Sequence, residues 1–84
     1  MNAADELKQA ITKSEAKLER LRSMMLNATR SSQEAKDSNR GITVIRYKER
    51  IITGLLVRVE QEKRHLAQLD DALDGVNDIM NTSY

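Results

Sequence analysis

The sequence predicts an all-α protein in which two long helices fold back on each other as an antiparallel coiled-coil hairpin. Three observations predict this fold class. Apolar residues recur every seven positions in two long series, the two series are out of phase with each other, and turn-forming residues lie where the phase changes. No proline interrupts either series.

The composition of the 84-residue chain is typical of long helices. Phe, Trp and Cys are absent, 32% of the residues are charged, and the apolar side chains are mostly Leu, Ile, Val, Met and Ala. The length predicts a single domain, residues 1–84, with a small core. The net charge of +1 neither favours nor excludes a nucleic-acid partner.

The first helix is expected over residues 3–36, with Asn2 as its N-terminal cap. Its apolar positions fall on two heptad positions, named a and d, which form one stripe along a helix. The a series is Ile11, Leu18, Met25 and Ser32, and the d series is Leu7, Ser14, Leu21, Ala28 and Ala35.

The second helix is expected over residues 42–80, and its heptads are more regular. The a series is Ile45, Ile52, Val59, Leu66, Leu73 and Met80, and the d series is Lys48, Leu55, Glu62, Leu69 and Val76. The stripe predicts that both helices present one apolar seam to each other.

A turn is predicted at residues 37–41, Asp-Ser-Asn-Arg-Gly, because these residue types favour turns and helix caps. From Ser32 to Ile45 the count is thirteen residues, where an unbroken heptad pattern requires fourteen. The alternative is one continuous helix of about 125 Å, at 1.5 Å per residue. The phase shift at a turn-like segment favours the hairpin.

A turn centred near Arg40 predicts which residues of the two helices face each other. The layers are Leu7 with Leu73, Ile11 with Leu69, Ser14 with Leu66, Leu21 with Val59, Met25 with Leu55, and Ala28 with Ile52. Flanking ion pairs are expected between Lys8 and Asp70 and between Glu15 and Lys63.

Two layers depart from this apolar pattern, because Leu18 faces Glu62 and Ser32 faces Lys48. We expect both long side chains to bend past the seam into solvent. The alternative is that the two charges specify the register or meet the charge of a partner.

The apolar residues outside the seam predict a partner-binding surface. They gather in the half of the hairpin near the turn, where the seam of the first helix offers only small residues. Gly54 lies in the same stretch, where it allows close backbone approach or is simply tolerated. Because one partner helix cannot cover so wide an apolar arc, we expect either a homodimeric four-helix bundle or a different protein to cover it. The predicted partner-binding residues are Met24, Leu26, Ile42, Val44, Ile51, Leu56 and Val57.

Catalytic and ligand-binding motifs are not evident, so we expect no enzyme, no cofactor and no metal. Glu62 and His65 have the Glu-x-x-His spacing of di-metal bundles, but His65 is the only histidine and further inward carboxylates are lacking. The acidic start does not resemble a secretory signal and no apolar run is long enough to span a membrane, which favours a cytoplasmic protein without membrane insertion.

The sequence thus predicts a non-enzymatic protein–protein interaction module: an adaptor, a small chaperone or an inhibitor. The alternative is a nucleic-acid-associated dimer that uses the basic band from Arg46 to Arg64, although the band has few aromatic residues for stacking. The outline resembles the small helical-hairpin co-chaperones of bacterial secretion systems, and Leu66 to Met80 resembles a SNARE-type coiled-coil segment. The second resemblance departs at Glu62, where a SNARE-type segment would have a central glutamine.

Overall fold

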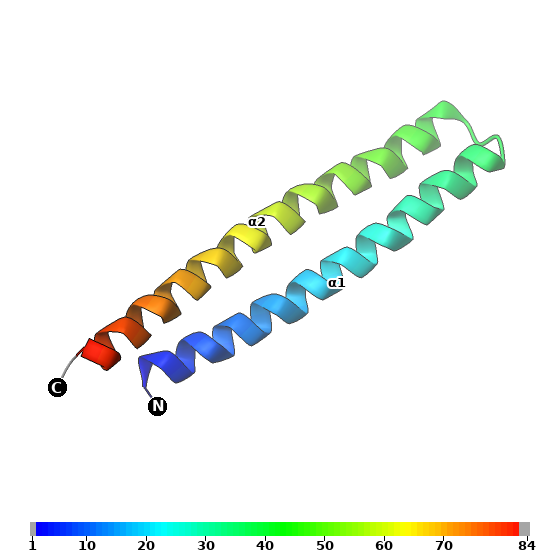
Figure 1. Ribbon diagram of the computed structural model, residues 1–84. Helices are drawn as coiled ribbons and strands as arrows, with labels where there is room; N and C mark the ends of the chain where they lie inside the picture. The colour runs from blue at the N-terminus through cyan, green and yellow to red at the C-terminus, as the bar shows by residue number, and fades with distance from the viewer. Residues whose placement is uncertain (1, 83–84) are drawn as a thin grey trace.

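The computed structural model describes residues 2–82, which form two helices joined by a short turn (Figure 1). Helix α1 is Ala3–Asp37 and helix α2 is Ile42–Thr82. The helices run antiparallel in a rod with extents of 68 × 15 × 15 Å, far shorter than a single helix of this chain. The predicted all-α helical hairpin is confirmed. The observed helices extend one and two residues beyond the predicted ranges of 3–36 and 42–80.

The start of α1 has a cap that its sequence supplies. The backbone N–H of Asp5 donates to Oδ1 of Asn2 at 2.9 Å, so one of the N–H groups that lack a partner within the helix is satisfied. Asp5 and Glu6 place negative charge in the first turn, where the helix dipole favours it.

The turn between the helices ends α1 with a left-handed residue. Asn39 has φ of 54°, a conformation that asparagine tolerates better than most residues. The N–H of Arg40 then donates to the carbonyl of Ala35 at 2.9 Å, and the N–H of Asn39 donates to that of Lys36 at 3.2 Å. This bonding pattern stops the helix and reverses the chain, and the carbonyl of Gly41 accepts the first bonds of α2.

The core lies in the middle of the seam between the two helices. A cluster of buried residues comprises Leu18, Leu21, Leu55 and Val59, with Met25, Ala28 and Leu66 packed against it. The cluster unites the predicted layers of Leu21 with Val59 and of Met25 with Leu55. Even Leu21 keeps 3% of its surface exposed, because two helices cannot enclose a side chain from every direction.

Every predicted seam position except Met80 is buried or half-buried, and Ala10 and Ser31, which were not predicted, are half-buried as well. Met80 was assigned to the seam, but 56% of its surface is exposed. This assignment was wrong because the a position of Met80 falls near the end of α2, where little of α1 remains to cover it. At the start of α1, Ala4 extends the buried a series by one heptad.

The flanking ion pairs predicted from the register are not formed. Lys63 pairs with Glu60 of its own helix at 3.5 Å instead of with Glu15, and residues 2–82 show no ion pair between Lys8 and Asp70. An intrahelical partner three residues away competes with a partner on the other helix. Exposed pairs of either kind stabilise a protein too little for a heptad pattern to predict which one forms.

We predict that the middle of the seam dominates the stability of the hairpin. Leu21→Ala should lower the free energy of unfolding by about 2–4 kcal/mol, because it removes buried methyl groups and leaves a cavity. Leu26→Ala is the matched control, because the side chain of Leu26 is 61% exposed. Urea denaturation followed by circular dichroism measures both changes. Equal losses for the two variants would contradict the position assigned to the core.

Candidate partner-binding surface

The middle of the seam holds one buried charge, Glu62, which bonds to two residues of α1. Glu62 is 6% exposed. Its Oε2 accepts a hydrogen bond from Oγ of Ser14 at 2.9 Å, and its Oε1 lies 3.2 Å from Nζ of Lys17. The expectation that Glu62 bends into solvent was wrong. The small side chain of Ser14 leaves room for the carboxylate inside the seam and supplies a donor to it.

The charged form of Glu62 is favoured by this environment. The hydrogen bond from Ser14 is the largest influence and lowers the pKa of Glu62 below its ordinary value of 4.5. Desolvation opposes this effect, whereas Lys17 and the electrostatic influence of His65 also lower the pKa of Glu62. The three side chains Ser14, Lys17 and Glu62 therefore form a satisfied polar contact between α1 and α2.

The Glu-x-x-His pattern of the sequence does not form a metal centre in residues 2–82. Within that range no three His, Cys, Asp or Glu side chains lie together in a way that could hold a metal ion. Both oxygens of Glu62 are occupied by Ser14 and Lys17. Glu62 therefore has a structural explanation that involves no ligand.

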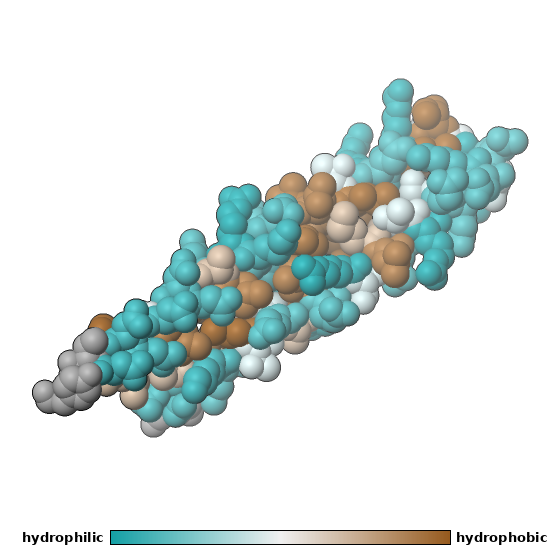
Figure 2. All heavy atoms as spheres, in the orientation of Figure 1, coloured by the Kyte–Doolittle hydropathy of each residue, from teal (hydrophilic) through white to brown (hydrophobic). Residues whose placement is uncertain are grey.

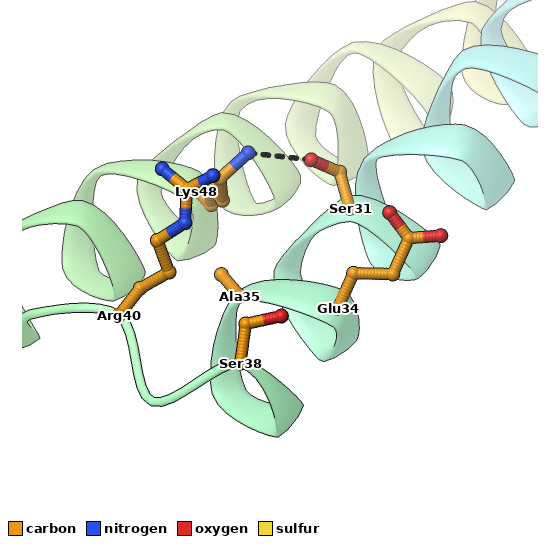
Figure 3. A pocket seen from close by; sticks show the side chains of 6 residues that line it. All are labelled: Ser31, Glu34, Ala35, Ser38, Arg40 and Lys48. Carbon is orange, nitrogen blue, oxygen red and sulfur yellow. Dashed lines mark hydrogen bonds between the residues drawn. The ribbon is translucent and has the colours of Figure 1, made fainter.

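The second polar seam position, Lys48, lies at the turn end of the rod. Nζ of Lys48 donates to Oγ of Ser31, so this side chain leaves the seam along its edge. Figure 3 shows Lys48 extending from α2 towards Ser31, with Arg40 beside it and Glu34 across from them. They border a shallow depression of about 180 Å³, lined by Ser31, Glu34, Ala35, Ser38, Arg40 and Lys48.

All seven residues predicted to bind a partner are exposed in the hairpin. The exposed fraction runs from 37% for Val44 to 61% for Leu26. Figure 2 shows apolar side chains at the surface over the middle of the rod and towards the turn. The role of these residues in binding stays a prediction.

The predicted residues do not form one continuous patch, because the structure distributes them over different sides of the seam. One flank, which we name the g flank, is formed by residues that directly precede the a positions of both helices: Met24, Val44 and Ile51. Met24 borders a depression that Lys17, Arg20, Leu21 and Arg58 also line. Met24 of α1 and Arg58 of α2 are both g positions, and both line this depression. The g positions of the two helices therefore lie on the same side of the seam.

The opposite flank, which we name the e flank, carries Ile42 and Leu56, with Leu26 next to it on α1. Residues that directly follow the d positions of both helices lie on this flank. Lys36 of α1 and Glu49 of α2 are two such residues, and their ion pair at 3.3 Å shows that the e positions of the two helices are on the same side. Val57 lies on neither flank but on the outer side of α2. A heptad pattern assigns residues to flanks, so the signal that divides these residues is present in the sequence.

Three further large apolar side chains are exposed that the sequence analysis did not select: Tyr47, Ile79 and Met80. Tyr47 is 64% exposed and is three residues from Val44 and four from Ile51, so it extends the g flank outwards. The sequence itself indicates that Tyr47 is exposed, because this apolar residue lies outside both the a and the d series of α2.

The cations of the basic band of α2 are distributed between its outer side and its flanks. Arg46, Arg50 and Arg64 lie on the outer side, at heptad positions b and f, and Arg58 lies on the g flank. Lys48 and Lys63 bond to Ser31 and Glu60. The nucleic-acid alternative stays a prediction.

The buried carboxylate predicts how the stability of the hairpin depends on pH. Because folding lowers the pKa of Glu62, its contribution to stability is present above the unfolded-state pKa and is lost as the pH falls through the folded-state pKa. Glu62→Gln should therefore flatten the decline in the free energy of unfolding below pH 4.5. The matched control is Glu19→Gln, at an exposed carboxylate of α1. Chemical denaturation from pH 7 to pH 3 measures the slopes, and parallel slopes for wild type and Glu62→Gln would contradict the role of this carboxylate.

Neither helix within residues 2–82 combines the length and the apolar character that crossing a membrane requires. Comparison with family models, with curated proteins and with solved structures finds no match to this chain. The geometry of the hairpin and its exposed apolar side chains are therefore the basis on which a function is proposed.

Proposed function

We propose that this chain is a non-enzymatic protein–protein interaction module that acts as an adaptor, a small chaperone or an inhibitor. The observation that carries the proposal is the exposure of large apolar side chains. Ten such side chains in the described residues are at least 37% exposed, whereas the buried cluster of the seam has four members.

The energetics of burial support a partner. Covering apolar surface yields roughly 25 cal/mol for each Å² removed from water. A two-helix hairpin has a small core and is marginally stable by itself. A partner that covers the exposed side chains adds to the apparent stability because it binds the folded hairpin and not the unfolded chain.

The position of the exposed side chains points to the half of the rod near the turn. Eight of the ten lie between Met24 and Val57, and only Ile79 and Met80 lie elsewhere. The seam beside them is lined by the small side chains of Ala28, Ser32 and Ala35. This half of the hairpin therefore combines most of the exposed large apolar side chains with small side chains in its seam. A partner that covers this half would bury most of those exposed side chains.

The proposal predicts the effect of a charge on each flank. Ile51→Asp on the g flank and Leu56→Asp on the e flank should each reduce association about tenfold or more, because the carboxylate would have to be desolvated in the complex. Loss of the partner should also lower helicity in a marginally stable hairpin. Sedimentation, circular dichroism and pull-down from the native host measure these effects.

The matched control is Arg30→Asp, at an exposed position of α1 that faces away from α2. It should leave association and helicity close to those of the wild type. If both flank variants keep the assembly state, the bound proteins and the helicity of the wild type, then the exposed side chains are a tolerated surface and the proposed function is wrong.

A further inference from the structure

A groove between α1 and α2 runs along the g flank as a row of three depressions, each lined by side chains of both helices. The depression near the turn is lined by Ser31 of α1 and Lys48 of α2 (Figure 3). The next, of about 210 Å³, is lined by Lys17 and Arg58, and the third, of about 280 Å³, by Lys17 and His65. Because Lys17 lines both of these, they are adjacent. We name the row of depressions the g groove, because Ser31, Lys17, Arg58 and His65 are all g positions.

Small side chains of α1 leave this groove open. Ala10 and Ser31 are g positions of α1, and Ser14 is a seam position that lines the third depression together with Ala10. Such short side chains reach only part of the way from α1 to the g positions of α2. A groove between two helices is the shape that receives a third helix, whose side chains reach into the depressions.

The charge along the g groove has one sign. No g position of either helix is acidic, and the basic g positions are Lys17 and Arg58, with His65 beside them. The c positions of α1, which lie next to its g positions around the helix axis, add Lys13 and Arg20. The e positions of the two helices differ, since they comprise four basic and three acidic residues. The g flank is therefore the side of the hairpin that lacks its own compensating charges.

The two carboxylates that border the g groove do not neutralise its middle. Glu62 is 6% exposed, and it pairs with Lys17 at 3.2 Å. Glu34 borders the depression near the turn, at the end of the groove. Within residues 2–82 Arg20 and Arg58, which line the middle depression, form no ion pair. Two exposed guanidinium groups thus face the groove without an anionic partner.

Apolar side chains accompany these cations. Met24 lines the same depression as Arg20 and Arg58, and the buried Leu21 lines it as well. Ile51 continues the g positions of α2 from Arg58 towards the turn, and its side chain is exposed. An occupant that complements this groove has to supply both apolar side chains and negative charge.

We propose that the g groove binds an acidic amphipathic helix of a different protein. This inference rests on the proposed function and names the chemistry of its partner. An apolar stripe of the bound helix would pack against Met24 and Ile51, and carboxylates beside that stripe would lie next to Arg20 and Arg58. The bound helix would lie alongside both α1 and α2 as the third helix of a bundle.

A nucleic acid complements the g groove less well. Its phosphates would contact the cations, but they would leave Met24 and Ile51 without an apolar partner. Bases that stack on a protein use aromatic side chains, and Tyr47 is the only aromatic residue among residues 2–82.

A second copy of this chain also complements the groove less well. The most acidic segment of the chain is residues 70–78, which contain four aspartates. The large apolar residues of this segment, Leu73 and Val76, are half-buried in the seam of their own hairpin. This segment would therefore bring carboxylates into the groove of another copy without an apolar stripe to cover Met24.

Two synthetic peptides test the chemistry of the partner. Both are amphipathic helices three heptads long with Leu at the a and d positions. One has Glu at every e and g position and the other has Lys. The wild-type chain should bind the Glu peptide about tenfold more tightly than the Lys peptide. Added salt should reduce this preference, because it screens exposed charges. Fluorescence anisotropy of labelled peptide measures the dissociation constants, and equal affinities for the two peptides would overturn the inference.

Charge reversal tests the location of the site. Arg20→Glu and Arg58→Glu should each weaken binding of the Glu peptide about tenfold. Arg22→Glu is the matched control, because Arg22 is exposed on the e flank of the same helix, and it should leave binding unchanged. The double variant Arg20→Glu/Arg58→Glu should bind the Lys peptide more tightly than the wild type does, which a loss of folding would not produce. Circular dichroism checks that each variant keeps its helicity.

Other results would assign the groove differently and overturn the inference. Equal weakening by Arg20→Glu and Arg22→Glu would place the peptide elsewhere. Tighter binding of a DNA duplex than of the Glu peptide, lost in Arg58→Glu, would assign the groove to nucleic acid. Self-association of the wild type that Arg58→Glu abolishes would assign it to a second copy.

Capture of proteins from the native host separates this inference from the proposed function. If Leu56→Asp abolishes capture of a foreign protein while Arg58→Glu and Met24→Asp leave it intact, the proposed function stands and the g groove is not its site. If the chain binds neither itself, nor the peptides, nor another protein, both are wrong.

Discussion

The contact between α1 and α2 in the middle of the seam is the constraint on which the rest of this structure depends. Leu18 and Leu21 on α1 and Leu55 and Val59 on α2 form a cluster of buried apolar side chains. Each helix is long, but an isolated helix gains little stability in water without a packed face. The register of this contact therefore decides which side chains become buried and which stay exposed.

The polar residues of the seam limit how far that contact extends. Towards the open end, Ser14 and Glu62 form a hydrogen bond inside the seam, and towards the turn Lys48 reaches Ser31. Removing one partner of a buried charged contact destabilises a fold by more than the intact contact stabilises it. Such contacts therefore disfavour a shifted register, in which Glu62 would lose its donors, more than they stabilise the hairpin.

A two-helix fold also determines where its surface is apolar. Two cylinders meet along a line, so side chains on both flanks of the seam stay partly in contact with water. Met24 and Ile51 on one flank and Leu56 on the other are examples. The same geometry leaves the outer side of α2 uncovered, including Tyr47 and both helix-interior glycines.

The sequence by itself determined the two helices, the turn and the positions of the seam, because these follow from local periodicity and from the conformational preferences of residues such as Asn39. It also identified seven of the ten large apolar residues that are exposed in the described part of the chain. Only the tertiary structure decided that Glu62 is buried against Ser14 and that Met80 is exposed. These outcomes depend on the space beside a neighbouring side chain and on where one helix ends along the other. A one-dimensional pattern of apolar residues contains neither of these.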